Sequence, residues 1–206
     1  MHPADRMRIA RSLVVALAIV IPTYCGCATK TSTTHLWAAE THRAEPMTTM
    51  IVFGNGMAEA QRRSVEDQLA NALADHGVTA TPSYRIFPTL PDVAEARSEV
   101  TRRSFDGALV ITLHGTRERQ SYVPGHYQGG GFWGGYYGMG WGWSPGYVVL
   151  DEIVDAETSV WDLRSADGTL VWSALTNTEN PTSGHDLTKS MAKETLPKMA
   201  KAGIIP

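Results

Sequence analysis

Four carboxylates lie close together in the chain, at Asp151, Glu152, Asp155 and Glu157. Paired carboxylates perform glycoside hydrolysis, one as the acid and the other as the base or nucleophile. However, residues 147–163 are rich in Val, Ile and Thr, which predicts a β-strand, and side chains alternate between the two faces of a strand. We therefore interpret the four acids as solvent-exposed strand residues, with Glu152 on the opposite face to the others.

A second group of reactive residue types is the run Ser183-Gly184-His185-Asp186. It holds the residue types of a Ser-His-Asp triad, but triad members meet in space and are not sequence neighbours. No G-x-S-x-G motif surrounds any serine. We expect Ser183 or Asp186 to accept hydrogen bonds from free N–H groups at the start of a helix, which is a structural role.

The run Gly54-Asn55-Gly56 lies between a predicted strand and a predicted helix, as a dinucleotide-binding turn does. Glu59 occupies the place of the third glycine in that motif, where its charge would face a pyrophosphate. Histidines occur at positions 35, 42, 76, 114, 126 and 185, without H-x-x-x-H or H-x-H spacing. His114 and His126 can approach each other, but the sequence indicates no further ligands for a metal. We therefore expect no cofactor, no metal and no catalytic residue, and a protein that is not an enzyme.

The two cysteines, Cys25 and Cys27, end an N-terminal segment that has the form of a signal peptide. Three arginines precede an apolar run at 13–21, and Pro22 ends it. This run is shorter than the roughly 18 residues that span a membrane. The sequence therefore predicts export with residues 1–26 removed, and translation starting at Met1 or Met7.

Tyr24-Cys25-Gly26-Cys27 resembles the signal of bacterial lipoproteins, in which a small residue precedes the cysteine that is acylated after cleavage. Gly26 and Cys27 match this pattern, whereas Tyr24 stands where Leu or Val is usual. The resemblance implies a lipid anchor at Cys27 and, because Ala28 follows, a place on the periplasmic face of the outer membrane. The alternative is ordinary cleavage after Ala28, which gives a soluble periplasmic or secreted protein.

Removal of residues 1–26 leaves 180 residues and changes the formal net charge from −3 to −5, since three Arg and one Asp are lost. An acidic surface without a block of basic residues argues against nucleic acid as a partner. Residues 27–46 are polar and lack sustained periodicity, which predicts the anchor cysteine followed by a tether. Residues 47–206 are predicted to form a single domain.

The hydrophobic pattern of this domain predicts a mixed α/β (α+β) fold, in the order β-α-β-α-β, a loop, then β-β-α. Gly77 is expected at the end of the first helix, and a bulge or bend in the middle of the 147–163 strand. Strands are expected at 48–53, 78–84, 108–113, 147–163 and 169–175, and helices at 57–76, about 89–103 and about 185–202.

The loop at 125–146 contains ten glycines, seven aromatic residues and no Asp, Glu, Lys or Arg. Glycine at this density disfavours a packed element, because much backbone entropy is lost on ordering. One interpretation is a low-complexity insertion without a function of its own. Others are binding of a glycan or a protein partner through its aromatic rings, or contact with the membrane–water interface. The candidate contact residues are Tyr136, Tyr137, Trp141 and Trp143.

The chain as a whole resembles uncharacterised bacterial envelope lipoproteins of about this length. Their periplasmic layout is similar to that of the curli-secretion and the penicillin-binding-protein-activator lipoproteins. The resemblance implies a non-enzymatic envelope protein that acts through protein contacts, in an accessory or assembly role. A peptidoglycan- or glycan-binding module is the alternative, and an envelope hydrolase is a third hypothesis. The residues that carry the resemblance are Thr33–Trp37, Arg62–Asp67, Gly77-Val78, Pro82–Tyr84, Tyr122–Gly125, Glu157–Asp162 and Leu170–Ala174.

Overall fold

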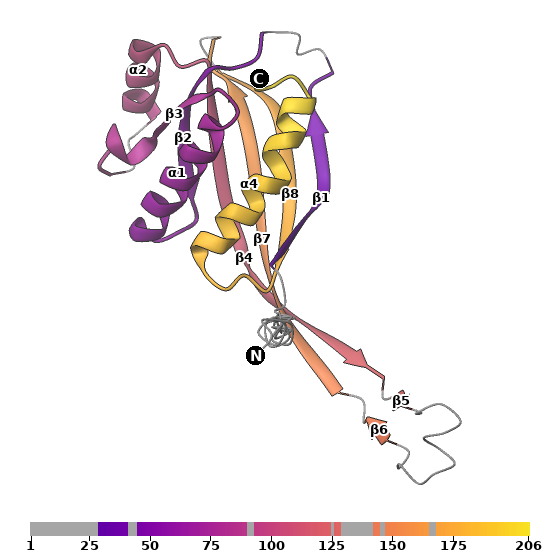
Figure 1. Cartoon of the computed structure of the whole chain (residues 1–206). Helices are drawn as coiled ribbons and strands as arrows, with labels where there is room; N and C mark the ends of the chain where they lie inside the picture. The colour runs from indigo at the N-terminus through magenta and orange to yellow at the C-terminus, as the bar shows by residue number, and fades with distance from the viewer. Residues whose placement is uncertain are drawn as a thin grey trace, which may run out of the picture.

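The fold is organised around a six-stranded mixed sheet with the strand order β1-β8-β7-β4-β2-β3 (Figure 1). The computed structural model of the chain describes residues 29–40, 45–89, 93–124, 126–128, 142–144, 147–164 and 168–206. The strands of the sheet are β1 (Lys30–Ala38), β2 (Thr49–Asn55), β3 (Thr79–Pro82), β4 (Gly107–Val123), β7 (Tyr147–Asp162) and β8 (Thr169–Glu179). The helices are α1 (Glu59–Ala74), α2 (Val93–Arg103) and α4 (Gly184–Lys201), with the short 3-10 turn η1 at Ser83–Arg85.

Parallel and antiparallel pairing divide the sheet into two halves. β2 pairs in parallel with both β3 and β4, and α1 makes the crossover between β2 and β3. The pairs β4–β7, β7–β8 and β8–β1 are antiparallel. The predicted mixed α/β (α+β) class is confirmed, and each predicted helix and strand has a counterpart in the structure.

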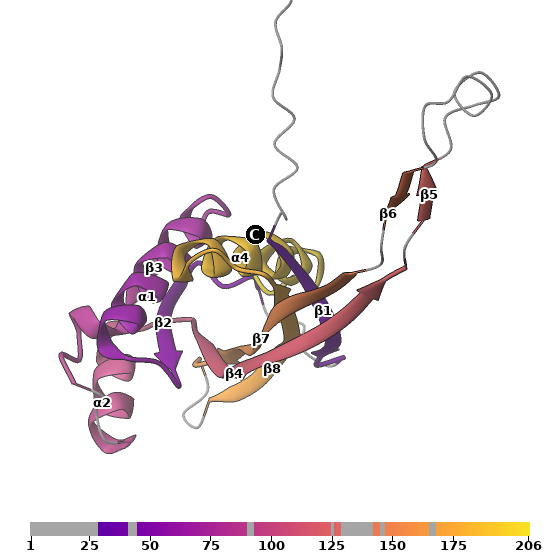
Figure 2. The ribbon, with the colours of Figure 1, turned by 90° about the horizontal axis from the view of Figure 1, so that it is seen from below.

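Helices α1 and α4 cover one face of the sheet and bury the main core (Figure 2). On this face Leu109, Val160 and Trp172 come from β4, β7 and β8, and all three are fully buried. Leu73 of α1 and Met199 of α4 pack against the same cluster. The apolar face of each helix meets the sheet, as the amphipathic pattern of the sequence requires.

The second face of the sheet is covered only at one side. Ile51, Phe87 and Ala108 form a small buried cluster there, against which Ala96 and Val100 of α2 pack. Over β7, β8 and β1 no described helix lies on this face, as Figure 2 shows. The sheet therefore has one open region, and its side chains are exposed.

The sequence prediction of a tether over residues 27–46 is wrong for residues 30–38, which form the edge strand β1. This strand is polar, so its burial depends on hydrogen bonds instead of apolar contacts. Thr31 Oγ1 lies 2.8 Å from both Thr178 Oγ1 and Ser190 Oγ, and Thr33 Oγ1 donates to Glu194 Oε1 at 2.9 Å. Polar side chains of β8 and α4 thus provide the hydrogen-bond partners of a strand that the hydrophobic pattern does not predict.

The ends of α1 and α4 confirm two predictions of capping. Gly77 has a φ of +77°, and the N–H of Val78 donates to the Leu73 carbonyl, which closes the end of α1. Ser183 Oγ accepts from the Asp186 N–H at 3.1 Å. The run Ser183–Asp186 is therefore the start of α4, where it satisfies free backbone groups.

Two smaller differences concern strand geometry. The expected strand at 78–84 ends at Pro82 and continues as η1. The bulged residues lie in the strands that flank β7, since the register skips His114 of β4 and Val171 of β8. No helix within the described residues is long and apolar enough to span a membrane.

Candidate functional site

The candidate site is a two-stranded ribbon, which we define as residues 116–124 of β4 and its end together with residues 147–152 of β7. β4 and β7 pair from Gly107↔Asp162 to Val123↔Tyr147, whereas β4 pairs with β2 only as far as Thr112 and β7 with β8 only as far as Ile153. The two strands therefore extend beyond the rest of the sheet, and Figures 1 and 2 show them projecting away from the helices. Beyond the ribbon, β5 (His126–Gln128) and β6 (Gly142–Ser144) continue as a short antiparallel pair.

The end of the ribbon exposes large apolar side chains. Tyr122 is 68% exposed, and Tyr147, Val148 and Leu150 are 58–59% exposed. Tyr122 pairs with Val148 and Gln120 with Leu150, so Tyr122, Val148 and Leu150 lie on one face. Contiguous exposed apolar side chains of this kind mark interaction surfaces.

Both edges of the ribbon are open within the described part of the chain. No described strand pairs with residues 116–123 of β4 or with residues 147–151 of β7 on their outer sides, whereas the N–H and C=O of Glu152 bond to Asn180. A strand edge presents a row of N–H and C=O groups that can pair with another extended chain. The ribbon therefore offers backbone hydrogen bonds as well as apolar side chains.

Ion pairs hold the base of the ribbon. Arg117 contacts Asp155 with an Nε–Oδ2 distance of 2.8 Å, and Arg119 Nη2 lies 3.1 Å from Asp151 Oδ2 and 3.0 Å from Glu179. Hydrogen bonds from the Asn180 side chain and from Arg119 lower the pKa of Asp151 below its ordinary value. The carboxylate of Asp151 is thus kept ionised. The side chains of Arg119, Asp151 and Glu179 join β4, β7 and β8 at the point where the ribbon leaves the sheet.

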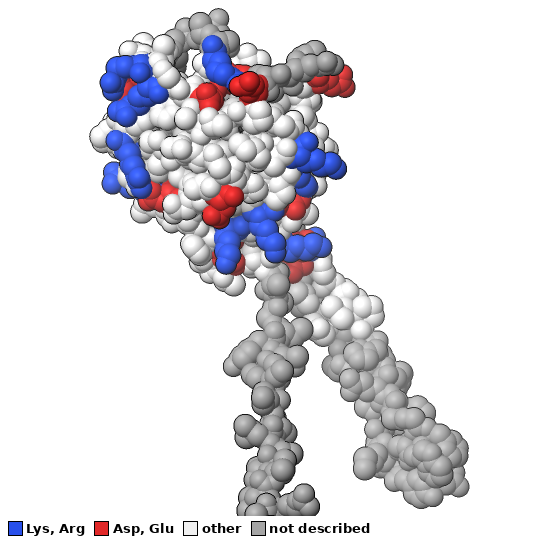
Figure 3. Space-filling view, turned by 45° about the horizontal axis from the view of Figure 1, so that its top comes forward, with Lys and Arg blue, Asp and Glu red and all other residues white. Residues whose placement is uncertain are grey.

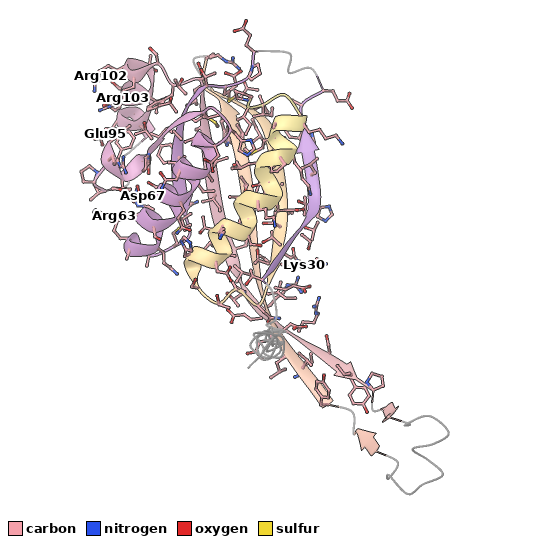
Figure 4. The ribbon with its side chains drawn as sticks, in the orientation of Figure 1. Lys30, Arg63, Asp67, Glu95, Arg102 and Arg103 are labelled. Atoms are coloured by element: carbon pink, nitrogen blue, oxygen red, sulfur yellow. The ribbon has the colours of Figure 1, made fainter. Side chains whose placement is uncertain are left out.

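The charge distribution separates the base of the ribbon from its end. In Figure 3 red and blue atoms surround the base of the ribbon, as they do other parts of the domain, whereas the described atoms further out along the ribbon are white. Residues 120–124 and 147–150 contain no Asp, Glu, Lys or Arg. Figure 4 places Lys30 beside the base, whereas Arg63 and Asp67 lie on α1 and Glu95, Arg102 and Arg103 on α2, far from the ribbon.

The carboxylates that the sequence singled out lie at the base of the ribbon and on the adjoining sheet. Asp151 and Asp155 bond to the arginines described above, and Glu157 accepts from Ser173 Oγ at 2.7 Å and lies 3.5 Å from His114 Nε2. Register places Glu152 opposite Glu118 on the other face. The predicted alternation of these acids between two faces is confirmed.

The other predicted site residues fall on parts of the chain that the structure describes incompletely. Cys27, Tyr136, Tyr137 and Trp141 lie outside the described residues. Trp143 belongs to β6, which pairs Trp143 with Tyr127. Their roles stay predictions.

The loop Gly54–Gly56 has a structural role that the sequence did not indicate. The Gly54 N–H donates to the buried carboxylate of Glu66 at 2.9 Å, and Glu66 Oε1 also accepts from Ser83 Oγ at 2.7 Å. Arg62 Nη1 in turn donates to Ser83 Oγ at 3.0 Å. Side chains of α1 thus form a buried hydrogen-bond network with the end of β2 and with Ser83.

Sequence reasoning missed a surface groove of about 420 Å³ between α1 and α4. Ala72, Ala192 and Leu196 give it an apolar wall, and Asp75, His76 and His185 also line it. The spacing of these residues in the sequence could have indicated the groove, because they recur at three- and four-residue intervals on the facing sides of two helices.

Comparison with known proteins does not assign the chain to a family. No protein-family model matches it, and no curated protein is similar to it. Solved structures that are similar include the PelC dodecamer from Paraburkholderia phytofirmans, with 15% identity and a TM-score of 0.45 over 82% of this chain and 96% of that chain. Lipoprotein GNA1162 from Neisseria meningitidis matches at 11% identity and a TM-score of 0.41, over 75% of this chain and 99% of that one. A minor lipoprotein from Acinetobacter baumannii matches at 11% identity and a TM-score of 0.31, over 78% and 97%. Likenesses at these identities and TM-scores establish no function for the chain.

Proposed function

We propose that the chain is a non-enzymatic, exported lipoprotein of the bacterial cell envelope that acts through protein contacts, in an accessory or assembly role. The observation that carries this proposal is the projecting ribbon, with exposed Tyr122, Tyr147, Val148 and Leu150 and two open edges within the described residues. The segment 125–146, which joins the two strands of the ribbon, is part of the same contact surface.

The ribbon suits a protein partner for two physical reasons. An extended segment of the partner adds to an open strand edge through main-chain hydrogen bonds, and this is a recurring mode of recognition. Aromatic and branched side chains beside that edge then supply buried area and anchors. The ion pairs of Arg117 and Arg119 hold the base of the ribbon, so that less conformational entropy is lost when the partner binds.

The proposed lipid anchor at Cys27 places the ribbon on the membrane side of the molecule. Thr29 is two residues after Cys27, and its hydroxyl donates to the Asn180 carbonyl at 3.1 Å and to Asp186. Lys30 pairs with Glu179, and Glu179 pairs with Ile153, where the ribbon leaves the sheet. The start of β1 and the base of the ribbon are therefore at the same end of the sheet.

A site-specific photo-crosslinker at Tyr122 or Leu150 tests the protein-contact proposal in living cells. Both positions should crosslink to the same envelope protein, because Tyr122 and Leu150 lie on one face of the ribbon. The same crosslinker at Lys193, on the exposed side of α4, is the matched control and should not capture that protein. Equal capture from Lys193, or different proteins from the two ribbon positions, would contradict the proposal.

Deletion of residues 126–144 tests the outer part of the surface. The shortened chain should still melt cooperatively, since the described core residues all lie outside the deletion. Capture of the partner should be lost. Capture that is retained would exclude this segment as a contact.

The anchor is tested independently by the mass of the mature N-terminus. The natural chain should carry added acyl mass at Cys27, and a Cys27→Ser variant should not. A mature chain without acyl mass would mean that the protein is a soluble periplasmic or secreted protein, and would leave the protein-contact proposal intact.

A further inference from the structure

The open region of the sheet carries two tryptophans that the proposed protein contact does not use. Trp37 of β1 is 49% exposed and Trp161 of β7 is 39% exposed. Leu175 of β8 is 37% exposed on the same face. On the opposite face of these strands Val160, Trp172 and Ala174 are buried to 1% or less, under α4 and α1. The two tryptophans are therefore exposed because this face has no covering layer in the described structure, and not because the strands are frayed.

Register places a shallow floor between the two indole rings. Trp37 pairs with Ser173 of β8, and Ser173 pairs with Ser159 of β7, so the two residues in line with Trp37 are both small. Ser173 and Ser159, with the neighbouring Glu157, are called the floor. Trp161 is two residues beyond Ser159 on the same face. Strand spacing and rise put the two tryptophan backbones about 10 to 12 Å apart. The two tryptophans and the serines between them form one open patch of the sheet, which we call the platform.

Hydrogen bonds within the protein orient the polar side chains of the floor. Trp161 Nε1 donates to Ser159 Oγ at 3.4 Å, and Ser173 Oγ donates to Glu157 Oε1 at 2.7 Å. The two serine oxygens and the Glu157 carboxylate keep further lone pairs that can accept hydrogen bonds. The floor therefore offers several acceptors to a ligand that brings O–H or N–H donors.

The charged and titratable side chains of this face contact one another within the protein. Arg117 contacts Asp155 at 2.8 Å, and His114 Nε2 lies 3.5 Å from Glu157 Oε2. No described Lys or Arg lies between Trp37 and Trp161 in the register of β1, β8 and β7. An anionic ligand would therefore find no cationic side chain between the two tryptophans, whereas the hydrogen-bond acceptors there suit a ligand with neutral O–H donors.

We propose that this face, with Trp37 and Trp161 as its two rings, binds a neutral glycan chain. The C–H faces of a pyranose ring are apolar and match the faces of the indoles, whereas its hydroxyl groups are donors for Ser159, Ser173 and Glu157. Apolar surfaces with a few convergent polar groups are the usual composition of such binding sites. This glycan site is distinct from the segment 125–146 on which the sequence analysis placed glycan binding, and it does not rest on the proposed protein contact.

Titration calorimetry with two uncharged probes tests the site. The mature full-length protein, in a detergent without a sugar headgroup, is titrated with a β-1,4-linked N-acetylglucosamine tetramer and with maltotetraose. At least one of these glycans should bind. Trp37→Ala and Trp161→Ala should each weaken binding about tenfold or more, because each removes one stacking surface. Trp37→Phe should retain most of the affinity, since a ring remains.

Leu36→Ser is the matched control, because it also removes an exposed apolar side chain of β1 but lies on the opposite face of the sheet, where Leu36 pairs with Ala174. It should leave glycan binding unchanged. The proposal is overturned if neither glycan binds, or if the two alanine variants bind as the natural protein does. It is also overturned if binding falls equally in Leu36→Ser. Self-association that Trp37→Ala abolishes, without glycan binding, would assign the face to a second copy of the chain and would equally overturn it.

Discussion

The guanidinium of Arg62 and the carboxylate of Glu66 lie one turn apart on α1, with Nη1 and Oε1 separated by 3.5 Å, and both side chains are buried. Glu66 also accepts from the N–H groups of Gly54 and Tyr84 and from the hydroxyl of Ser83. One buried carboxylate therefore joins α1 to the end of β2 and to η1. Arg62 also donates hydrogen bonds to the exposed carboxylate of Glu59, and these bonds raise the pKa of Arg62.

Glu66→Ala should lower the free energy of unfolding by about 3–5 kcal/mol, because it leaves two backbone N–H groups and the Ser83 hydroxyl without their acceptor and removes the buried carboxylate that pairs with Arg62. Urea unfolding followed by circular dichroism measures the change. Glu99→Ala is the control on α2, where the pairs with Arg102 and Arg103 are exposed to solvent. A loss as small as that of Glu99→Ala would show that the network does not stabilise the fold.

Gly56→Ala and Gly203→Ala form a matched pair, since both glycines have a φ of +72°. A left-handed alanine costs roughly 1–2 kcal/mol at either position. At Gly56 the added Cβ would also lie 2.7 Å from the Leu113 carbonyl oxygen, whereas at Gly203 nothing lies within 4 Å. Gly56→Ala should therefore show the larger fall in urea midpoint. Equal falls would mean that the turn after β2 relaxes freely.

The two faces of the sheet should respond differently to loss of tryptophan. Trp172 is fully buried, so Trp172→Ala should cost about 3–5 kcal/mol of stability through lost burial and a cavity. Trp161→Ala removes a side chain that is 39% exposed and should cost clearly less. Chemical unfolding of both variants measures the difference. Comparable losses would indicate that the open face is covered in solution.

Acid should weaken the connection between β2 and β4 at Asp106. Burial opposes ionisation of this carboxyl, but hydrogen bonds from the N–H and hydroxyl groups of Thr48 and Thr49 hold the pKa of Asp106 below its ordinary value. A depressed pKa contributes stability that is present above the unfolded-state value, near 3.8, and is lost as the pH falls through the folded-state value.

Asp106→Asn should therefore reduce stability at pH 7 and reduce the further loss between pH 4 and pH 2. Urea midpoints across this range measure both effects. An unchanged acid dependence in Asp106→Asn would show that other carboxyl groups, such as Glu194, determine it. Glu194 is a candidate because hydrogen bonds from Lys198 and Thr33 outweigh its burial and lower its pKa.

Local sequence patterns were sufficient to predict most elements of the fold. Val65, Leu69 and Leu73 recur at four-residue spacing, and all three are buried on the inner face of α1. Ser183 and Gly77 were recognisable as helix ends, because the chemistry of capping is local. Apolar runs such as 108–113 predicted strands, because burial on both faces requires apolar side chains at successive positions.

Tertiary structure decided the features that depend on distant partners. β1 lacks a hydrophobic pattern, and only Thr178, Ser190 and Glu194 make its threonines compatible with the sheet. The ribbon was not predicted, because the strand expected at 108–113 continues to Val123 in β4 and only the strand expected at 147–163 covered its part of the ribbon. The length of a hairpin depends on register and not on composition. Trp37 and Trp161 are 124 positions apart in the sequence and share a face only because β8 lies between their strands. The sequence by itself thus determined the helix ends and the mixed fold class, both of which depend on neighbouring residues, whereas the export signal stays a prediction. Both candidate binding surfaces depend on strand order and register, and only the packed sheet determines these.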